Sequence, residues 1–259
     1  MKIVVSPSYK HLSEFISDIP NRNYKCDELF MDSRNVVEKI TAPDGTELVV
    51  KRYKRPTRAN QIIYTFLRWS KPKRSYIFAQ RLEKLGIKTA EQAAYIETFK
   101  WGIFHTGYSI TRFIPDKRLE KVNDLHTEKR EAILHAFAEF TLDLHLKGIK
   151  HGDYNANNIF YRHENGRFCF TLIDINRMQF RRKIPDKDCM REFQRLLSRK
   201  DMITVAERYA ELRGWNIDVF CGAILMARGF NIIGKLKEGF RAAIKAVRLL
   251  AVRRRQRDY

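Results

Sequence analysis

The chain has 259 residues and carries 50 lysines and arginines against 30 aspartates and glutamates, which gives a formal net charge of +20. A hydrophobic content of 44% and an aromatic content of 12% argue against a disordered chain. The four cysteines form no CxxC pair, which argues against a zinc ribbon and is typical of the reducing cytosol. No apolar run approaches the ~18 residues that span a membrane, so the charge surplus points to an anionic partner: nucleic acid, a membrane face or a phosphorylated substrate.

A β-hairpin is predicted in the first third of the chain. Two segments rich in β-branched residues, 35–40 and 46–53, flank Pro43-Asp44-Gly45, which is a turn sequence. A helix is predicted from about Ser75 to Leu85, because Gly86 stands at its C-terminal cap position. This part of the chain is therefore expected to combine strands with one helix.

Two more strands are predicted over 93–113, with a tight turn between them at His105-Thr106. The pattern breaks at Ile114-Pro115, because proline has no backbone N–H to donate within a sheet. We expect this break to separate a small β-rich N-terminal lobe (1–114) from a mainly helical C-terminal lobe (115–259).

The second half of the chain is predicted to be mainly helical. Asn165-Gly166 predicts a hairpin between short strands at 159–161 and 168–175, and helices are expected from there to the C-terminus. Before the hairpin, four apolar residues predict one face of a long helix that Gly148 ends: Ile133, Phe137, Phe140 and Leu144. The predicted fold class is α+β with two lobes.

A polar segment with the sequence HGDYNANN lies between the long helix and the hairpin. It places an acid, Asp153, five residues before an amide, Asn158, and a second acid, Asp174, ends the strand after the hairpin turn. Because the two loops flank one hairpin, these carboxylate and amide oxygens can converge on one place. Hard oxygen ligands of this kind suit magnesium, which also binds phosphate oxygens.

The ordered set resembles the protein-kinase-like superfamily. The pattern HxDxxxxN is matched by His151, Asp153 and Asn158, and the later metal-binding aspartate by Asp174. Lys51, preceded by two valines, matches the strand lysine of that superfamily. All of these residues occur in the family's order, with the predicted helix and hairpin between them. On the residues alone, each could instead cap a turn or stand solvated on a strand.

The resemblance implies a role for each of these residues. Asp153 would orient the attacking hydroxyl and accept its proton, and Lys51 would pair with the phosphates of ATP. Asn158 and Asp174 would hold magnesium against the triphosphate. His151 would support the catalytic loop, and adenine would be held by the chain near the hinge residues: Arg112, Phe113 and Ile114.

Several departures from the superfamily pattern count against a kinase that acts on proteins. Asp174-Ile175-Asn176-Arg177 replaces the DFG motif, and no APE motif follows it. The loop at 32–35, DSRN, lacks the glycines that cover phosphates. Glu83 is the only acid in the predicted helix and stands near its end, so the acid partner of Lys51 is not identified.

A closer resemblance is to the lipopolysaccharide core kinases, which phosphorylate Kdo or heptose of the inner core. It is carried by HGD in place of HRD, by the DxNR ending at Arg177, and by Ser70-Lys71-Pro72-Lys73-Arg74-Ser75-Tyr76 before a helix that ends in Leu85-Gly86-Ile87. It implies ATP- and magnesium-dependent phosphorylation of a sugar hydroxyl on a lipid-linked core oligosaccharide. It also implies a cytoplasmic protein peripheral on the inner membrane.

Basic charge is concentrated in two segments. Residues 48–82 contain ten lysines and arginines and no acid, interleaved with apolar side chains over 62–69, and residues 235–259 contain nine against two acids. The second segment has the pattern of a basic amphipathic helix, which is typical of contact with an anionic membrane surface. Each segment could instead pack locally. No RNA-binding motif accompanies them, so nucleic acid is not expected as a partner.

Three other functions remain open on the sequence. The first is an atypical protein kinase of the RIO-like or Bud32-like kind, which also carries an HGD loop. The second is a non-catalytic pseudokinase that binds membrane or RNA, since the glycine loop is missing. The third is a kinase of a soluble small molecule such as an antibiotic or choline.

Overall fold

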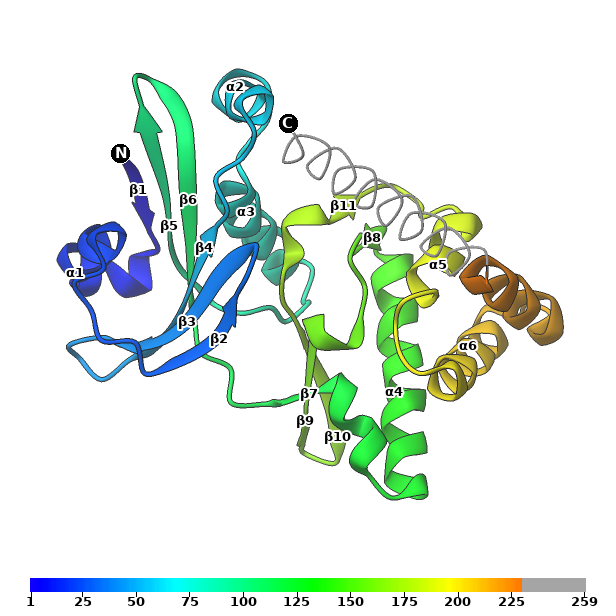
Figure 1. Cartoon of the computed structure of the whole chain (residues 1–259). Coiled ribbons are helices and arrows are strands. Elements are labelled where there is room, and N and C mark those ends of the chain that lie inside the picture. The colour runs from blue at the N-terminus through cyan, green and yellow to red at the C-terminus, as the bar shows by residue number, and fades with distance from the viewer. Residues whose placement is uncertain (230–259) are drawn as a thin grey trace, which may run out of the picture.

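The computed structural model describes residues 1–229 as two lobes that lie side by side (Figure 1). A six-stranded sheet dominates the N-terminal lobe, and helices dominate the C-terminal lobe. The two-lobed α+β architecture predicted from the sequence is thereby confirmed. Residue 114 remains our proposed boundary between the lobes, and the basic segment 235–259 lies outside the described residues.

The N-terminal sheet consists of β1 (Lys2–Val5), β2 (Glu28–Asp32), β3 (Asn35–Thr41), β4 (Glu47–Tyr53), β5 (Gln92–Lys100) and β6 (Ile103–Arg112). Its strand order is β1-β5-β6-β4-β3-β2, and every neighbouring pair is antiparallel. The predicted hairpin is confirmed as β3–β4, and Gly45 in its turn has a φ of +83°. This positive φ explains why the turn sequence contains glycine.

The predicted turn at His105-Thr106 is wrong. The chain reverses at Trp101-Gly102, so that Lys100 pairs with Ile103 and both former turn residues lie inside β6. Trp101 and Gly102 have φ values of 51° and 75°, which a two-residue hairpin of the primed type requires. The sequence hides this turn because a bulky aromatic residue seldom adopts a positive φ.

Three helices accompany the sheet in the described chain: α1 (Ser13–Asp18), α2 (Arg58–Phe66) and α3 (Lys71–Lys84). The helix predicted at 75–85 is α3, which begins four residues earlier because Ser70 caps it and accepts a hydrogen bond from the Lys73 N–H at 3.3 Å. The sequence analysis assigned no helix to α2.

The C-terminal lobe contains the helices α4 (Thr127–Leu146), α5 (Asp186–Phe193) and α6 (Arg199–Arg213), and the chain is helical again over 217–229. Its short strands are β7 (Lys117–Arg118), β8 (Ile149–Lys150), β9 (Ile159–Glu164), β10 (Arg167–Leu172) and β11 (Gln179–Phe180). The predicted hairpin is confirmed as β9–β10, with Asn165 and Gly166 both at positive φ. None of the helices within residues 1–229 is long and apolar enough to cross a membrane.

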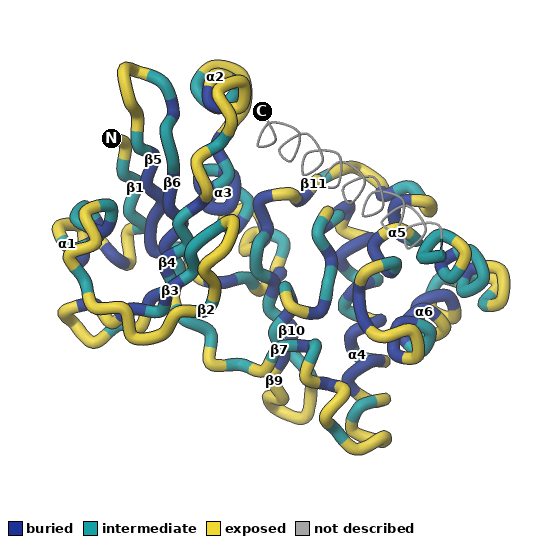
Figure 2. Tube along the Cα trace, viewed as in Figure 1, coloured by how far each residue is buried: buried dark blue, intermediate teal, exposed yellow. Residues whose placement is uncertain are grey.

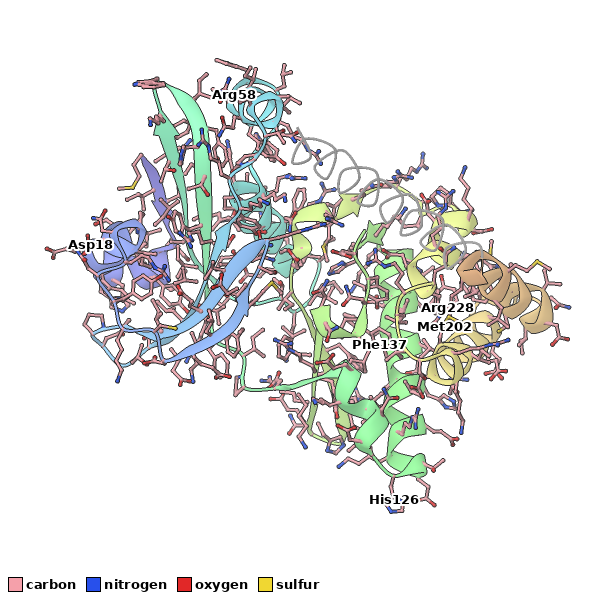
Figure 3. The ribbon with its side chains drawn as sticks, in the orientation of Figure 1. Asp18, Arg58, His126, Phe137, Met202 and Arg228 are labelled. Atoms are coloured by element: carbon pink, nitrogen blue, oxygen red, sulfur yellow. The ribbon has the colours of Figure 1, made fainter. Side chains whose placement is uncertain are left out.

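Each lobe has its own hydrophobic core (Figure 2). In the C-terminal lobe the predicted face of α4 is buried, and Phe137 lies in the interior against Phe170, with ring centres 5.2 Å apart (Figure 3). Leu82 of α3 belongs to this second core. Helix α3 therefore packs against both the sheet and the C-terminal lobe.

Hydrogen bonds to the end of β10 tie the lobes together. Thr89, in the segment between α3 and β5, donates from its hydroxyl to the Leu172 carbonyl at 2.7 Å. The Leu172 N–H donates to the Lys88 carbonyl at 3.1 Å. These contacts fix the loop that begins at Ile173 against the N-terminal sheet, and this loop carries Asp174.

Candidate active site

A cavity of about 630 Å³ lies between the lobes. Its walls come from strands β2, β3, β4 and β6 above, and from β9 and the loop after β10 below. Six of the sequence-predicted site residues line it: Lys51, Arg112, Phe113, Ile114, Asn158 and Asp174. The structure therefore gathers residues that are more than one hundred positions apart in the chain around one space.

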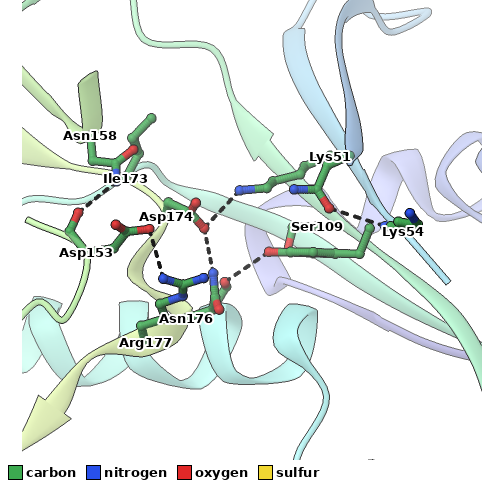
Figure 4. Close-up of polar contacts among 12 residues, drawn as sticks. Lys51, Lys54, Ser109, Asp153, Asn158, Ile173, Asp174, Asn176 and Arg177 are labelled. Carbon is green, nitrogen blue, oxygen red and sulfur yellow. Dashed lines mark hydrogen bonds and ion pairs between the residues drawn. The ribbon is translucent and has the colours of Figure 1, made fainter. Parts of the chain in front are cut away.

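Lys51 and Asp174 form an ion pair at the inner end of the cavity (Figure 4). The Lys51 Nζ lies 2.8 Å from Asp174 Oδ1. Burial disfavours the Lys51 ammonium, but the nearby Tyr53 and Asp174 outweigh it and raise the pKa of Lys51. Burial likewise opposes ionisation of Asp174, yet the Lys51 charge lowers its pKa. Both groups are therefore charged at neutral pH, as a phosphate- and metal-binding pair requires.

The loop 151–158 is held by a hydrogen bond within it and by others to the loop after β10. Within the loop, the Asn158 side-chain amide donates to the Asp153 carbonyl at 2.9 Å, and from the loop after β10 the Ile173 N–H donates to the Asn158 carbonyl at 2.9 Å. His151 is fully buried, and its Nε2 lies 3.0 Å from the Ile173 carbonyl. Burial lowers the pKa of His151, which favours a neutral structural role for this side chain.

Glu192 is a site residue that the sequence analysis missed. Its carboxylate, buried in α5, accepts the His151 N–H at 3.0 Å and the Gly152 N–H at 2.8 Å. Burial opposes its ionisation, but His145 and His151 nearby lower its pKa. Glu192 thus fixes the backbone immediately before Asp153. No local motif signals this role, because the contact joins residues forty positions apart.

The Asp153 carboxylate lies outside the cavity lining and beside two arginines. Its Oδ2 is 3.4 Å from the Arg177 guanidinium, and its Oδ1 is 3.9 Å from that of Arg195 (Figure 4). About a fifth of the Asp153 side chain, 19%, is exposed. The carboxylate is thus accessible from solvent beside the pair of Lys51 and Asp174, where a second substrate can approach it.

The opposite end of the cavity is aromatic and contains the predicted hinge. The Phe113 ring stacks on Phe30 with an interplanar angle of 7° and ring centres 6.2 Å apart. The backbone N–H groups of Arg112 and Phe113 already donate to the Glu91 and Glu47 carbonyls. Of the three hinge residues, only Ile114 therefore keeps its N–H available, and Ile114 lines the cavity together with the two aromatic rings.

Asn158 and Asp174 meet the requirements of a magnesium site. The Asn158 nitrogen is engaged by the Asp153 carbonyl, which leaves its side-chain oxygen as the available ligand. The Asp174 carboxylate supplies charged oxygens and is oriented by Asn176, whose amide donates to it at 2.5 Å. Within residues 1–229 no group of three or more histidine, cysteine or acidic side chains could hold a metal alone. A cation here would complete its shell with phosphate oxygens and water, as magnesium does.

Helix α3 offers no acid to Lys51 in the described structure. Glu83, the only acid of the helix, is exposed near its end. The side chains of α3 that face the segment after β10 include two basic ones, Lys71 and Arg74, and both experience repulsion from the Arg177 charge. Asp174 is therefore the carboxylate that pairs with Lys51.

Comparisons with known proteins agree with this geometry. A family model described as "Lipopolysaccharide kinase (Kdo/WaaP) family" matches residues 41–212. No curated protein sequence matches the chain.

Among solved structures, the chain is similar to WaaP in complex with acyl carrier protein, at 17% identity over 89% of this chain and 98% of that chain, with a TM-score of 0.61. It is also similar to APH(2")-IIa in a ternary complex with streptomycin and ATP, at 15% identity over 88% of this chain and 93% of that chain, with a TM-score of 0.51. At such identities these likenesses establish the fold. The protein-kinase-like fold expected from the motifs is thereby confirmed.

Proposed function

The chain belongs to the lipopolysaccharide kinase (Kdo/WaaP) family, and from this premise we propose that it transfers the γ-phosphate of ATP to a sugar hydroxyl of the lipopolysaccharide inner core, on Kdo or heptose. One observation carries the proposal: Lys51, Asp174, Asn158 and Asp153 follow one another from the end of a nucleotide-sized cavity to the solvent. Phosphoryl transfer needs mainly positioning and charge neutralisation, and these groups supply both.

ATP is proposed to fill the cavity with its base in the aromatic slot. The Ile114 N–H is the hinge donor available to adenine, and Phe30 and Phe113 border the base. At the other end the Lys51 ammonium faces the phosphates. The similarity in fold to a protein solved with ATP supports this choice of nucleotide.

Asn158 and Asp174 are the residues that would hold magnesium, which neutralises charge on the transferring phosphate. Asp153 orients the acceptor hydroxyl toward the phosphate and takes its proton as the bond forms. Glu192 and His151 hold the loop in place without touching a substrate. The Lys51 charge keeps Asp174 ionised for its role.

The acceptor is proposed to be lipid-linked, and one surface of the protein suits contact with a membrane. Phe66 (71% exposed) and Leu67 (80% exposed) lie at the end of α2, and Trp101 (90% exposed) is in the β5–β6 turn. The Phe104 N–H of β6 donates to the Thr65 hydroxyl of α2 at 2.9 Å, so the two elements lie together at one end of the lobe (Figure 2). We name these three exposed residues the apolar tip.

Cations lie beside Trp101 in the apolar tip. Arg58, at the start of α2 (Figure 3), lines one hollow with Trp101 and Lys100, and the Lys100 Nζ lies 5.0 Å from the centre of the Trp101 ring. The sequence has no acid from residue 48 to residue 82. Anionic lipid attracts each nearby cation by about 1 kcal/mol, and apolar side chains add to this by entering the headgroup region. We infer that the protein acts as a peripheral protein on the cytoplasmic face of the inner membrane.

Mass spectrometry of lipid A–core glycolipid, incubated with ATP and magnesium with and without the protein, tests the proposed function. A gain of one phosphate only in the presence of the protein is expected. Transfer to protein substrates but not to the glycolipid would instead identify an atypical protein kinase. ATP binding without transfer to any acceptor would identify a pseudokinase.

Co-sedimentation with vesicles tests the membrane surface. Trp101→Ser and Leu67→Ser are expected to weaken binding to vesicles containing phosphatidylglycerol. Leu146→Ser removes a similarly exposed apolar residue (66% exposed) from the end of α4 and should have no effect. Equal loss in all three variants would refute the apolar tip as the contact.

A further inference from the structure

One face of α3 is basic where it meets the segment that follows Asp174. Lys71, Arg74 and Phe78 are three or four residues apart, which places them on one side of the helix. The Phe78 ring packs on Phe180 with ring centres 5.2 Å apart, so this side of the helix covers the segment from Ile175 to Phe180. Lys71 and Arg74 therefore stand next to Arg177, which belongs to the same segment.

The Arg74 side chain is buried without a partner among the described residues. Only 7% of the residue is exposed; its backbone N–H donates to the Ser70 carbonyl, but its buried side-chain Nε has no hydrogen-bond partner within residues 1–229. Burial and the repulsion of Arg68 lower its pKa. A buried arginine without a carboxylate partner is costly, because its charge loses water and gains no counter-charge in exchange. An anionic ligand beside Arg74 would supply that counter-charge.

The residues around Arg74 also favour binding of an anion, because few acids are available to pair with them. Burial and the charge of Arg177 lower the pKa of Lys71, which also experiences repulsion from Lys51 and Arg74. Asp174 is already paired with Lys51, and Asp153 is shared by Arg177 and Arg195. Around Asp153 and Asp174, five cationic side chains thus face these two acids: Lys51, Lys71, Arg74, Arg177 and Arg195.

The position of Arg177 indicates which substrate carries the anion. Its guanidinium contacts Asp153, the residue proposed to act on the acceptor hydroxyl, while Lys51 occupies the phosphate end of the nucleotide cavity. Neither Lys71, Arg74 nor Arg177 lines that cavity. An anion bound by these three residues therefore sits on the acceptor side of the transferring phosphate.

We propose that Lys71, Arg74 and Arg177 form a subsite for an oxyanion, a carboxylate or a phosphate, that the acceptor sugar carries close to the hydroxyl to be phosphorylated. Arginine presents a planar fork of donors that matches the two oxygens of such a group. The subsite makes the kinase selective for an acidic acceptor over a neutral one. This inference rests on the proposed function, because it assumes that Asp153 faces the acceptor.

Calorimetry on the full chain, preloaded with magnesium and a non-hydrolysable ATP analogue, tests the subsite without requiring turnover. The probes are the methyl glycoside of Kdo, which carries a carboxylate, and its neutral methyl ester. A second pair, a methyl heptoside with and without a phosphate, distinguishes phosphate from carboxylate. The unmodified protein should bind one of the acidic probes at least about tenfold more tightly than its neutral counterpart, because tenfold corresponds to ~1.4 kcal/mol, which one charged hydrogen bond can supply.

Lys71→Gln and Arg74→Gln should each abolish most of this preference and change the affinity for the ATP analogue less than twofold. Lys84→Gln, which removes an exposed lysine from the same helix, should leave the preference intact. Lys71 is only partly buried, so its variant tests the subsite even if the Arg74 variant does not fold. Equal binding of acidic and neutral probes, or a loss that falls on the ATP analogue instead, would overturn the inference.

Turnover separates this inference from the proposed function. If acidic probes bind through Lys71 and Arg74 but no phosphate is transferred to them, the subsite stands and the proposed reaction fails. If neutral and acidic sugars are phosphorylated equally well, the kinase stands and the subsite fails.

Discussion

Replacement of Glu192 tests how the catalytic loop is held. The carboxylate is 5% exposed and accepts two backbone N–H groups, those of His151 at 3.0 Å and Gly152 at 2.8 Å. It also lies 3.5 Å from His145 Nε2. Glu192→Ala leaves both N–H groups without an acceptor, and that of His151 is buried. Glu192→Gln keeps the size and shape of the side chain but replaces one acceptor oxygen by an NH₂ donor, which then faces one of these N–H groups.

The expected losses follow from these contacts. The buried His151 N–H left without an acceptor costs about 1–3 kcal/mol, and loss of the part-buried bond to Gly152 adds to it, so Glu192→Ala should lower the free energy of unfolding by about 2–4 kcal/mol. Glu192→Gln loses one charged hydrogen bond and should cost about 1.5–3 kcal/mol. Because the freed backbone leads directly to Asp153, a shift of about 1 Å there should lower kcat by roughly 10²-fold even where the variant is folded.

Urea unfolding gives the stability of each variant, and kcat is measured well below its unfolding temperature. Glu131→Ala, which removes an exposed acid from α4, is the matched control and should change the free energy of unfolding by less than about 0.5 kcal/mol. If Glu192→Ala is as stable and as active as that control, the loop is not held by this carboxylate and our account of the site's rigidity is wrong.

Further predictions concern the loop, its buried histidine and the ion pair. Gly152→Ala should lower stability and activity more than Gly45→Ala when unfolding and rate are measured in parallel. Both glycines have a positive φ, so both substitutions are strained, but only at Gly152 would the new Cβ lie 2.7 Å from a backbone carbonyl oxygen, that of Arg177. Burial opposes protonation of His145, yet Cys189 and Glu192 raise its pKa. Protonated His145 therefore stabilises the fold fully below the ordinary histidine pKa of 6.5, and this stabilisation is lost as the pH rises through the raised pKa. Urea unfolding measured against pH should show the loss in the unmodified protein and not in His145→Gln. Lys51→Gln should lower kcat/KM for ATP by at least about 10²-fold with the fold intact by circular dichroism, and a smaller change than Arg52→Gln causes would refute the role of Lys51.

Local turn chemistry made two hairpins predictable. Asp44-Gly45 and Asn165-Gly166 supply the positive φ that their turns require, and strands β3–β4 and β9–β10 form there. At Trp101-Gly102 the same geometry was missed, since the tryptophan adopts a conformation that its side chain disfavours. Tertiary packing of β5 against β6 decides that turn, and the local sequence does not reveal it.

Some residues of the candidate site could likewise be predicted from the sequence, and others could not. Lys51, Asn158 and Asp174 were identified from an ordered motif, and the structure brings them together around one cavity. Glu192 belongs to no motif, and the motif that contains Arg74 does not reveal its role, because the importance of both comes from burial. Glu192 accepts two distant backbone donors, and the buried Nε of Arg74 has no partner among the described residues. Properties of this kind depend on which elements pack together, and only the folded chain displays them.

The measurement that tests the central claim most directly is transfer of labelled γ-phosphate from ATP to purified lipid A–core glycolipid by the unmodified protein and by Asp153→Ala. Our account predicts magnesium-dependent transfer of one phosphate per glycolipid, which the variant loses by at least about 10²-fold while its fold and its affinity for ATP stay unchanged. Undiminished transfer by Asp153→Ala, or no transfer to the glycolipid by the unmodified protein, would contradict it.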